Sequence, residues 1–101
     1  MWICLSDAFY SIVAHRSRPG HLLVRARRQG DIERLWPDAD VSDTPAADYR
    51  YRAIVPADRV AHAIAGAVRS IDYGNFKASV HDDALAAAYG KVWAILAALQ
   101  R

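Results

Sequence analysis

The chain has 101 residues, of which 53% are hydrophobic and 24% are charged, and its formal net charge at pH 7 is +2. This length and composition predict a single globular domain over residues 1–101, and the absence of an apolar run of about 18 residues excludes a membrane-spanning protein. The small net charge excludes a strongly acidic mimic of DNA and does not by itself argue for nucleic-acid binding. A lone cysteine, Cys4, indicates a reducing compartment, so we expect a cytoplasmic protein.

Strand signals dominate the first half of the chain. Residues 2–14 are rich in β-branched and aromatic side chains but contain Ser-Asp at positions 6 and 7, which predicts either one bent strand or two short strands, the second over residues 8–14. A Pro-Gly pair at positions 19 and 20 predicts a turn before the next strand, over residues 21–28. We also expect a brief edge strand at Val41 and a longer strand over residues 49–55.

The strands predicted over residues 21–28 and 49–55 share one pattern. Because side chains point alternately to the two faces of a sheet, the apolar residues of each strand turn to one face and its arginines to the other. We therefore expect one face in the core and one half-exposed face that carries Arg25, Arg27, Arg50 and Arg52.

Helix signals follow these strands. Gly30 precedes a short helix over residues 31–36, and Pro56 opens a helix whose apolar side chains recur every three to four residues as far as Ile71. A last helix is predicted from Ala84 to about Leu99, capped by one of two preceding aspartates. Its seam could pack within the chain or against a second copy and consists of Leu85, Tyr89, Val92, Leu96 and Leu99.

This order of elements predicts an α+β protein in which an antiparallel sheet has its helices packed on one face. A ferredoxin-like topology is the leading alternative, because the second part of the chain approximates strand-helix-strand-strand-helix, and a related two-layer sandwich is the other. Either arrangement leaves one face of the sheet uncovered by helices, and the arginine side chains would lie there.

The arginine-bearing face has three interpretations. It could bind the phosphates of single-stranded nucleic acid, with Phe9 or Tyr10 available to stack on a base. It could be a solvated face whose arginines pair with nearby acids, which is the ordinary reason for such alternation. It could also contact a partner protein or a second copy, since arginine and tyrosine are enriched at interfaces.

The segment IDYGNFKASV, from residue 71 to residue 80, places Tyr73 and Phe76 on either side of a Gly-Asn turn. These rings could form an aromatic docking loop. The alternative, which we favour, is that they fold back onto the core between two helices, because aromatic side chains usually pack inward.

Catalytic and metal-binding patterns are weak. The four histidines and Cys4 match no nucleophile motif, and a cysteine in an apolar strand is most often an inert core residue. No spacing of histidines and carboxylates specifies a metal site. We therefore expect no catalytic residues, no metal and no cofactor.

Four segments together resemble a group of short uncharacterised bacterial proteins that carry a domain of unknown function: DAFYSIVAHR, LLVRARRQGDIERLWP, DYRYRAIVP and IDYGNFK. The resemblance spans nearly the whole chain. It implies a free-standing bacterial cytosolic protein and brings no activity, cofactor or site residue with it.

We therefore predict a small non-enzymatic interaction or regulatory module. Its partner would be a protein, a ribonucleoprotein or a second copy, and an inhibitor of a mobile element is one form it could take. The residues expected at this interface are Arg25, Arg27, Arg50, Arg52, Tyr10, Tyr73 and Phe76. The alternatives are a single-stranded nucleic-acid-binding protein, which uses the same face, and a small enzyme with a histidine-containing site.

Overall fold

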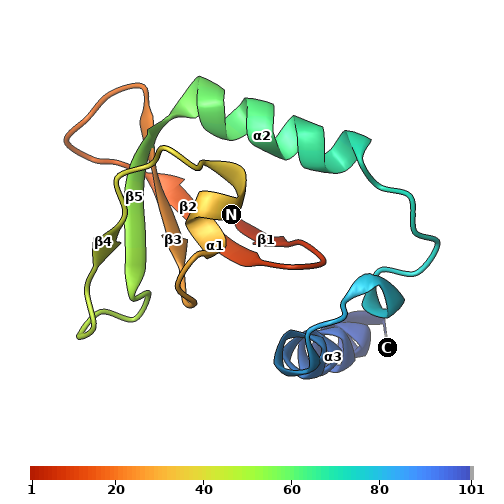
Figure 1. Cartoon of the computed structure of the whole chain (residues 1–101). Coiled ribbons are helices and arrows are strands. Elements are labelled where there is room, and N and C mark those ends of the chain that lie inside the picture. The colour runs from red at the N-terminus through yellow and green to blue at the C-terminus, as the bar shows by residue number, and fades with distance from the viewer. Residues whose placement is uncertain (101) are drawn as a thin grey trace. The chain divides into compact units, whose positions relative to one another are not determined.

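The computed structural model describes residues 1–100, which form five strands and three α-helices (Figure 1). The strands are β1 Trp2–Cys4, β2 Phe9–Ala14, β3 His21–Ala26, β4 Ser42–Asp43 and β5 Tyr51–Pro56. The α-helices are α1 Asp31–Leu35, α2 Ala57–Arg69 and α3 Asp83–Ala97, and two 3-10 turns are η1 Lys77–Ser79 and η2 Ala98–Gln100. The two-strand interpretation of residues 2–14 is therefore confirmed, and so are the predicted helices to within a few residues at each end.

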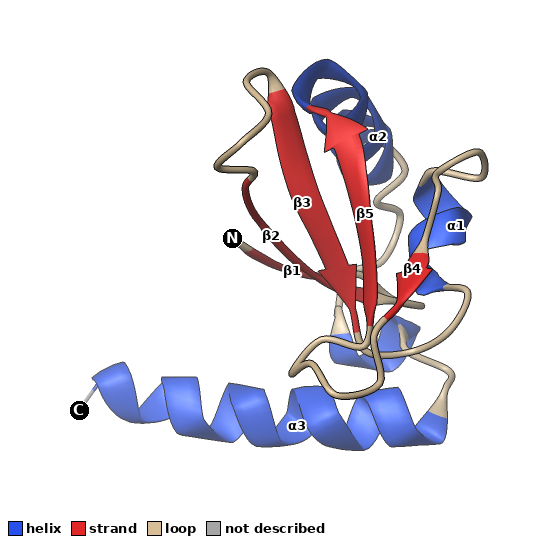
Figure 2. Cartoon of the chain, turned by 90° about the vertical axis from the view of Figure 1, so that its left-hand side faces the viewer, coloured by secondary structure: helices blue, strands red, loops and turns tan. Residues whose placement is uncertain are grey.

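The strands form one antiparallel sheet in the order β1-β2-β3-β5-β4 (Figure 2). In its centre Val24 of β3 lies opposite Ile12 of β2 and Ala53 of β5. The predicted α+β class is confirmed. The strand order distinguishes the two predicted topologies. A ferredoxin-like fold has a helical crossover after its first strand, whereas β1, β2 and β3 follow one another directly, so the related two-layer sandwich fits the structure.

The chain divides into two units. The first contains residues 1–3 and 9–71, and therefore most of the sheet with α1 and α2. The second contains residues 4–8 and, among those described, residues 72–100, and therefore η1 and α3.

The core of the first unit lies between the sheet and its two helices. Tyr10 and Trp36, at the end of α1, are buried with their rings 5.5 Å apart in an edge-on arrangement. The Tyr10 hydroxyl donates a hydrogen bond to the Asp31 carbonyl (2.6 Å), and the Trp36 indole donates one to the Arg59 carbonyl in α2 (3.2 Å). A helix of five residues is not stable alone, so these contacts hold α1 in place.

Asp31, at the start of α1, is a buried carboxylate. It follows Gly30, which adopts the left-handed φ of 90° that glycine accepts most easily. Burial raises the pKa of Asp31, although Arg28 and Arg34 act in the opposite direction from 3.6 Å on either side. The carboxylate is thus paired, yet its charge is costly in this position.

The second unit is built around the first half of α3. The side chain of Asp82 caps the helix by accepting a hydrogen bond from the Leu85 backbone N–H (2.9 Å), so Asp82 is the cap among the two predicted aspartates. The Tyr89 side chain is buried, and its hydroxyl lies 3.0 Å from the carbonyl oxygens of Leu5 and Ala8. Residues 4–8 and α3 are therefore fixed to each other.

Candidate interaction surface

The sheet of the first unit has one face that packs on α1 and α2 and a second face on the side away from these helices. The helices contact the alternate residues of β2, β3 and β5 that are buried in the core. The remaining residues of these strands define what we call the outer face: Phe9, Ser11, Val13, Leu23, Arg25, Arg52 and Ile54. Trp2 of β1 joins this face, because its ring contacts that of Phe9 at 6.0 Å. Trp2 is 69% exposed, and Val13 and Ile54 are exposed as well.

Three arginines of the outer face gather around one tyrosine. Arg25 and Arg52 lie directly opposite each other in neighbouring strands, and Arg27 follows immediately after β3. The guanidinium carbons of Arg25 and Arg27 lie 4.6 Å and 4.3 Å from the centre of the Tyr49 ring. The tyrosine is only 6% exposed, so these cation–π contacts are partly desolvated.

Asp48 supplies negative charge to this group. It accepts a hydrogen bond from Arg52 (2.9 Å), and its backbone carbonyl accepts one from Arg27 (2.8 Å). The Tyr49 backbone N–H, and then the charges of Arg52 and Arg25, hold the pKa of Asp48 below its usual range. We call the set of Arg25, Arg27, Asp48, Tyr49 and Arg52 the arginine cluster; it contains three guanidinium groups and one carboxylate.

Ser11 of β2 positions Arg25. The Arg25 guanidinium donates to the Ser11 hydroxyl at 2.6 Å and more weakly to the Ser11 carbonyl at 3.4 Å. Ser11 is 1% exposed, so this serine lies beneath the arginine. The sequence analysis did not identify Ser11, although its position in the alternation of β2, between two core residues, is the signal that places it on the outer face.

Arg50 does not belong to the arginine cluster, contrary to the sequence-based expectation. β5 begins at Tyr51, so Arg50 precedes the strand instead of alternating with Arg52. It forms two hydrogen bonds to the Asp43 carboxylate in β4 (2.7 Å and 3.1 Å), and this pairing lowers the pKa of Asp43. The self-paired interpretation therefore describes Arg50 well.

The three aromatic candidates also lie elsewhere. Tyr10 is fully buried in the core of the first unit and is not available for stacking on a ligand, as its alternation with Ile12 in β2 would have indicated. Tyr73 and Phe76 are half-buried, with rings 5.8 Å apart, and the Phe76 ring lies 5.4 Å from that of Tyr89. They thus pack within the second unit, as the inward-folding alternative expects.

The histidines are dispersed. His62 and His81 are exposed, and His21 lies with Nδ1 3.0 Å from the Pro19 carbonyl oxygen. The Nδ1 atom of His15 is buried without a hydrogen-bond partner, and His15 lines a groove of about 340 Å³ at one end of the outer face, together with Arg18, Asp40 and Arg52. Within residues 1–100, no three His, Cys, Asp or Glu side chains lie close enough together to hold a metal ion.

Cys4 is exposed, so its expected place in the core is wrong. Partial burial of the sulfur nevertheless raises the pKa of the thiol, and a hydrogen bond with Tyr89 offsets only part of this effect. The thiol is therefore protonated at neutral pH and is a poor nucleophile.

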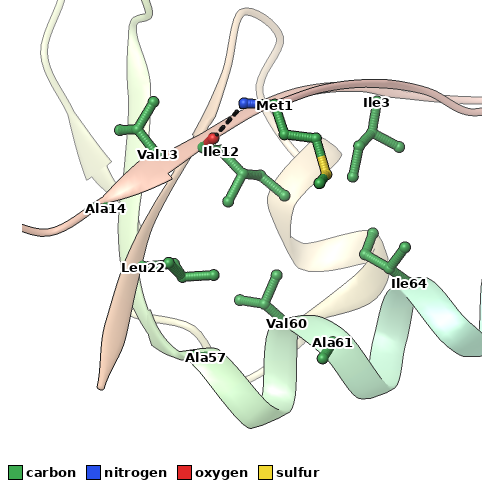
Figure 3. A pocket seen from close by; sticks show the side chains of 10 residues that line it. All are labelled: Met1, Ile3, Ile12, Val13, Ala14, Leu22, Ala57, Val60, Ala61 and Ile64. Atoms are coloured by element: carbon green, nitrogen blue, oxygen red, sulfur yellow. Dashed lines mark hydrogen bonds between the residues drawn. The ribbon is translucent and has the colours of Figure 1, made fainter. Parts of the chain in front are cut away.

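A second feature of the first unit is an apolar groove on the helix side of the sheet edge (Figure 3). Its volume is about 480 Å³, and the side chains of β1, β2 and β3 face those of α2 across it. The lining residues are Met1, Ile3, Ile12, Val13, Ala14, Leu22, Ala57, Val60, Ala61 and Ile64. We call this feature the apolar groove; the sequence analysis did not predict it.

None of the helices within residues 1–100 has both the length and the apolar character that crossing a membrane requires. No protein-family model, curated protein or solved structure matches the chain, so the resemblance to short bacterial proteins stays a prediction.

Proposed function

We propose that this chain is a non-enzymatic interaction module that binds an acidic protein partner through the outer face. The observation that carries the proposal is the arginine cluster, in which Tyr49 holds two guanidinium groups in place beside Arg52. Side chains that are already ordered lose little conformational entropy when a partner binds.

The surroundings of the arginine cluster support a protein as the partner. Trp2, Val13 and Ile54 expose apolar area on the same face, and interfaces are enriched in arginine and aromatic residues around such a centre. One carboxylate for three guanidinium groups leaves an excess of positive charge, which favours a partner that presents aspartate or glutamate.

Affinity purification from the cells that encode the chain tests this proposal. The wild type is compared with the double variant Arg25→Glu/Arg52→Glu and with Arg69→Glu, a matched control that reverses the charge of an exposed arginine in α2. We expect a protein that is captured by the wild type and the control and is lost with the double variant. Equal capture by all three would contradict the role of the outer face.

Single-stranded nucleic acid is a second candidate for the same face. It is favoured by the exposed ring of Trp2, because aromatic side chains can stack on bases beside a basic groove. Fluorescence anisotropy with a labelled oligonucleotide tests it: three phosphate contacts would give a slope of about −2 for log K against log salt, and Arg25→Ala would reduce that slope. Weak binding without a salt dependence would exclude this candidate.

A further inference from the structure

The predicted seam of α3 is covered along only half of its length. Leu85 and Tyr89 are buried within the second unit. The next three seam residues are increasingly exposed: Val92 by 41%, Leu96 by 56% and Leu99 by 80%. We call these three residues the free seam.

The free seam is part of a larger apolar surface. Trp93 and Ile95 flank it and are themselves more than half exposed. Residues 92–99 include no charged side chain, and the Lys77 ammonium lies against them, 4.0 Å from the centre of the Trp93 ring. The exposed fractions of these five residues amount to about three whole side chains, or on the order of 600 Å² at about 200 Å² each. That is as large as the largest apolar patch on a typical monomer, and such patches mark interaction sites.

The apolar groove offers a complementary surface. A cavity of about 150 Å³ accommodates one benzene-sized group, so a groove of about 480 Å³ accommodates about three, which is the number of side chains in the free seam. No charged side chain lines the groove, and Val68 continues the same apolar stripe of α2 in an exposed position. The groove therefore matches the free seam in both size and chemistry.

We propose that two copies of the chain form a symmetric dimer in which the free seam of each copy occupies the apolar groove of the other. Under two-fold symmetry both contacts form together, because each copy gives its free seam and receives that of its partner. It would bury the free seam and its flanking residues, on the order of 600 Å² on each copy, together with the lining of both grooves. A stable interface buries about 1,200–2,000 Å² in total over both partners. Pairing two α3 helices alone would leave both apolar grooves open to water.

The dimer does not use the arginine cluster, so it stands independently of the proposed function. Its occupied surfaces are α3 and the helix side of the sheet edge. Charge reversal at Arg25 and Arg52 is therefore expected to leave the dimer intact, and failure of one proposal can be told from failure of the other.

Size exclusion with light scattering tests the exchange over a range of protein concentrations. The groove variant is Ala61→Glu, because Ala61 is exposed and lines the groove, and the seam variant is Leu96→Glu. The matched controls are His62→Glu and Ala94→Glu, which introduce the same side chain at exposed positions on the opposite sides of α2 and α3. Circular dichroism confirms that each variant is folded, and Leu96→Ala replaces Leu96→Glu if the latter is not.

We expect a wild-type dimer, unchanged controls and at least a tenfold increase in the dissociation constant for each of the two interface variants. The decisive measurement is their equimolar mixture. In an exchanged dimer the mixed pair retains one intact seam in one intact groove, so mixing Ala61→Glu with Leu96→Glu should restore dimers that neither variant forms alone.

Three results would overturn the proposal. A wild type that is monomeric at all concentrations would show that no second copy fills the groove. Loss of the dimer in Leu96→Glu but not in Ala61→Glu would show that α3 pairs with α3. Loss in both variants without recovery on mixing, or loss in neither, would show that the seam and the groove do not meet.

Discussion

Replacing Tyr49 by leucine tests whether the ring organises the arginine cluster. Leucine retains most of the buried apolar area but removes the aromatic face that lies 4.6 Å and 4.3 Å from the Arg25 and Arg27 guanidinium carbons. A cation–π contact contributes about 0.5–1 kcal/mol when exposed and about 2 kcal/mol when desolvated. Two such contacts predict that Tyr49→Leu lowers the free energy of unfolding by about 1–3 kcal/mol, out of a total of about 5–15 kcal/mol for a chain of this length.

Urea denaturation followed by circular dichroism, at one fixed protein concentration, measures this loss. A double-mutant cycle with Arg27→Met isolates the contact, because methionine keeps an apolar stem without the charge. We expect a coupling of about 0.5–1 kcal/mol between the two substitutions. The matched cycle pairs Tyr49→Leu with Arg69→Met, in α2, and should be additive within about 0.5 kcal/mol. A Tyr49–Arg27 coupling no larger than that of the matched cycle would refute the role assigned to the ring.

Three further predictions concern Trp36, Asp31 and Cys4. Trp36→Phe should lower the free energy of unfolding by about 1 kcal/mol, because it removes the hydrogen bond to the Arg59 carbonyl. Trp36→Ala should lower it by about 3–5 kcal/mol, because it also removes the buried ring. Both losses are measured by urea denaturation, and equal losses would contradict the buried position of the ring. Burial raises the pKa of Asp31 above 3.8. The wild type should therefore lose stability relative to Asp31→Asn as pH rises from 3.8 through the folded-state pKa. A stability difference between the two proteins that does not change with pH would show that the buried charge of Asp31 is not costly. Burial raises the pKa of the Cys4 thiol, so less of it is in the reactive thiolate form at pH 7. Although Cys4 is exposed, iodoacetamide should therefore modify it at least severalfold more slowly in the folded protein than in the urea-unfolded protein. Equal rates in the two states would contradict the raised pKa.

The alternation of side chains predicted the centre of the arginine cluster correctly but failed at the ends of the strands. Arg25 and Arg52 face the same side because both lie inside β3 and β5, where the period of two holds. Arg50 lies in a turn, since its carbonyl accepts hydrogen bonds from the backbone and the side chain of Thr44 (both 2.7 Å). Because Arg50 lies outside β5, the alternation of side chains along the strand does not apply to it.

The seam of α3 illustrates a different limit. Its spacing of three and four residues was sufficient to predict a helix with one apolar stripe. The same spacing continues from Leu85 to Leu99, so nothing in the pattern distinguishes the half that is buried from the half that is exposed. That division depends on residues 4–8, which lie far away in the sequence and contact Tyr89. The apolar groove was not predicted for the same reason, because its lining comes from separate elements.

The pairing of Arg25 with Arg52 supports the proposal of an acidic partner for the outer face. Like charges directly opposite each other in a sheet are unfavourable, and here the Tyr49 ring and the Asp48 carboxylate offset the repulsion. Asp48 is exposed and bonds directly to Arg52, whereas its charge acts on Arg25 from a greater distance. The contacts that Arg25 makes with Ser11 and with the Tyr49 ring are to neutral groups. A carboxylate brought by a partner would supply Arg25 with the direct ion pair that Asp48 gives to Arg52. An acidic residue should therefore bind there more strongly than a neutral residue of the same shape, and Arg25→Gln should abolish that preference in a binding titration.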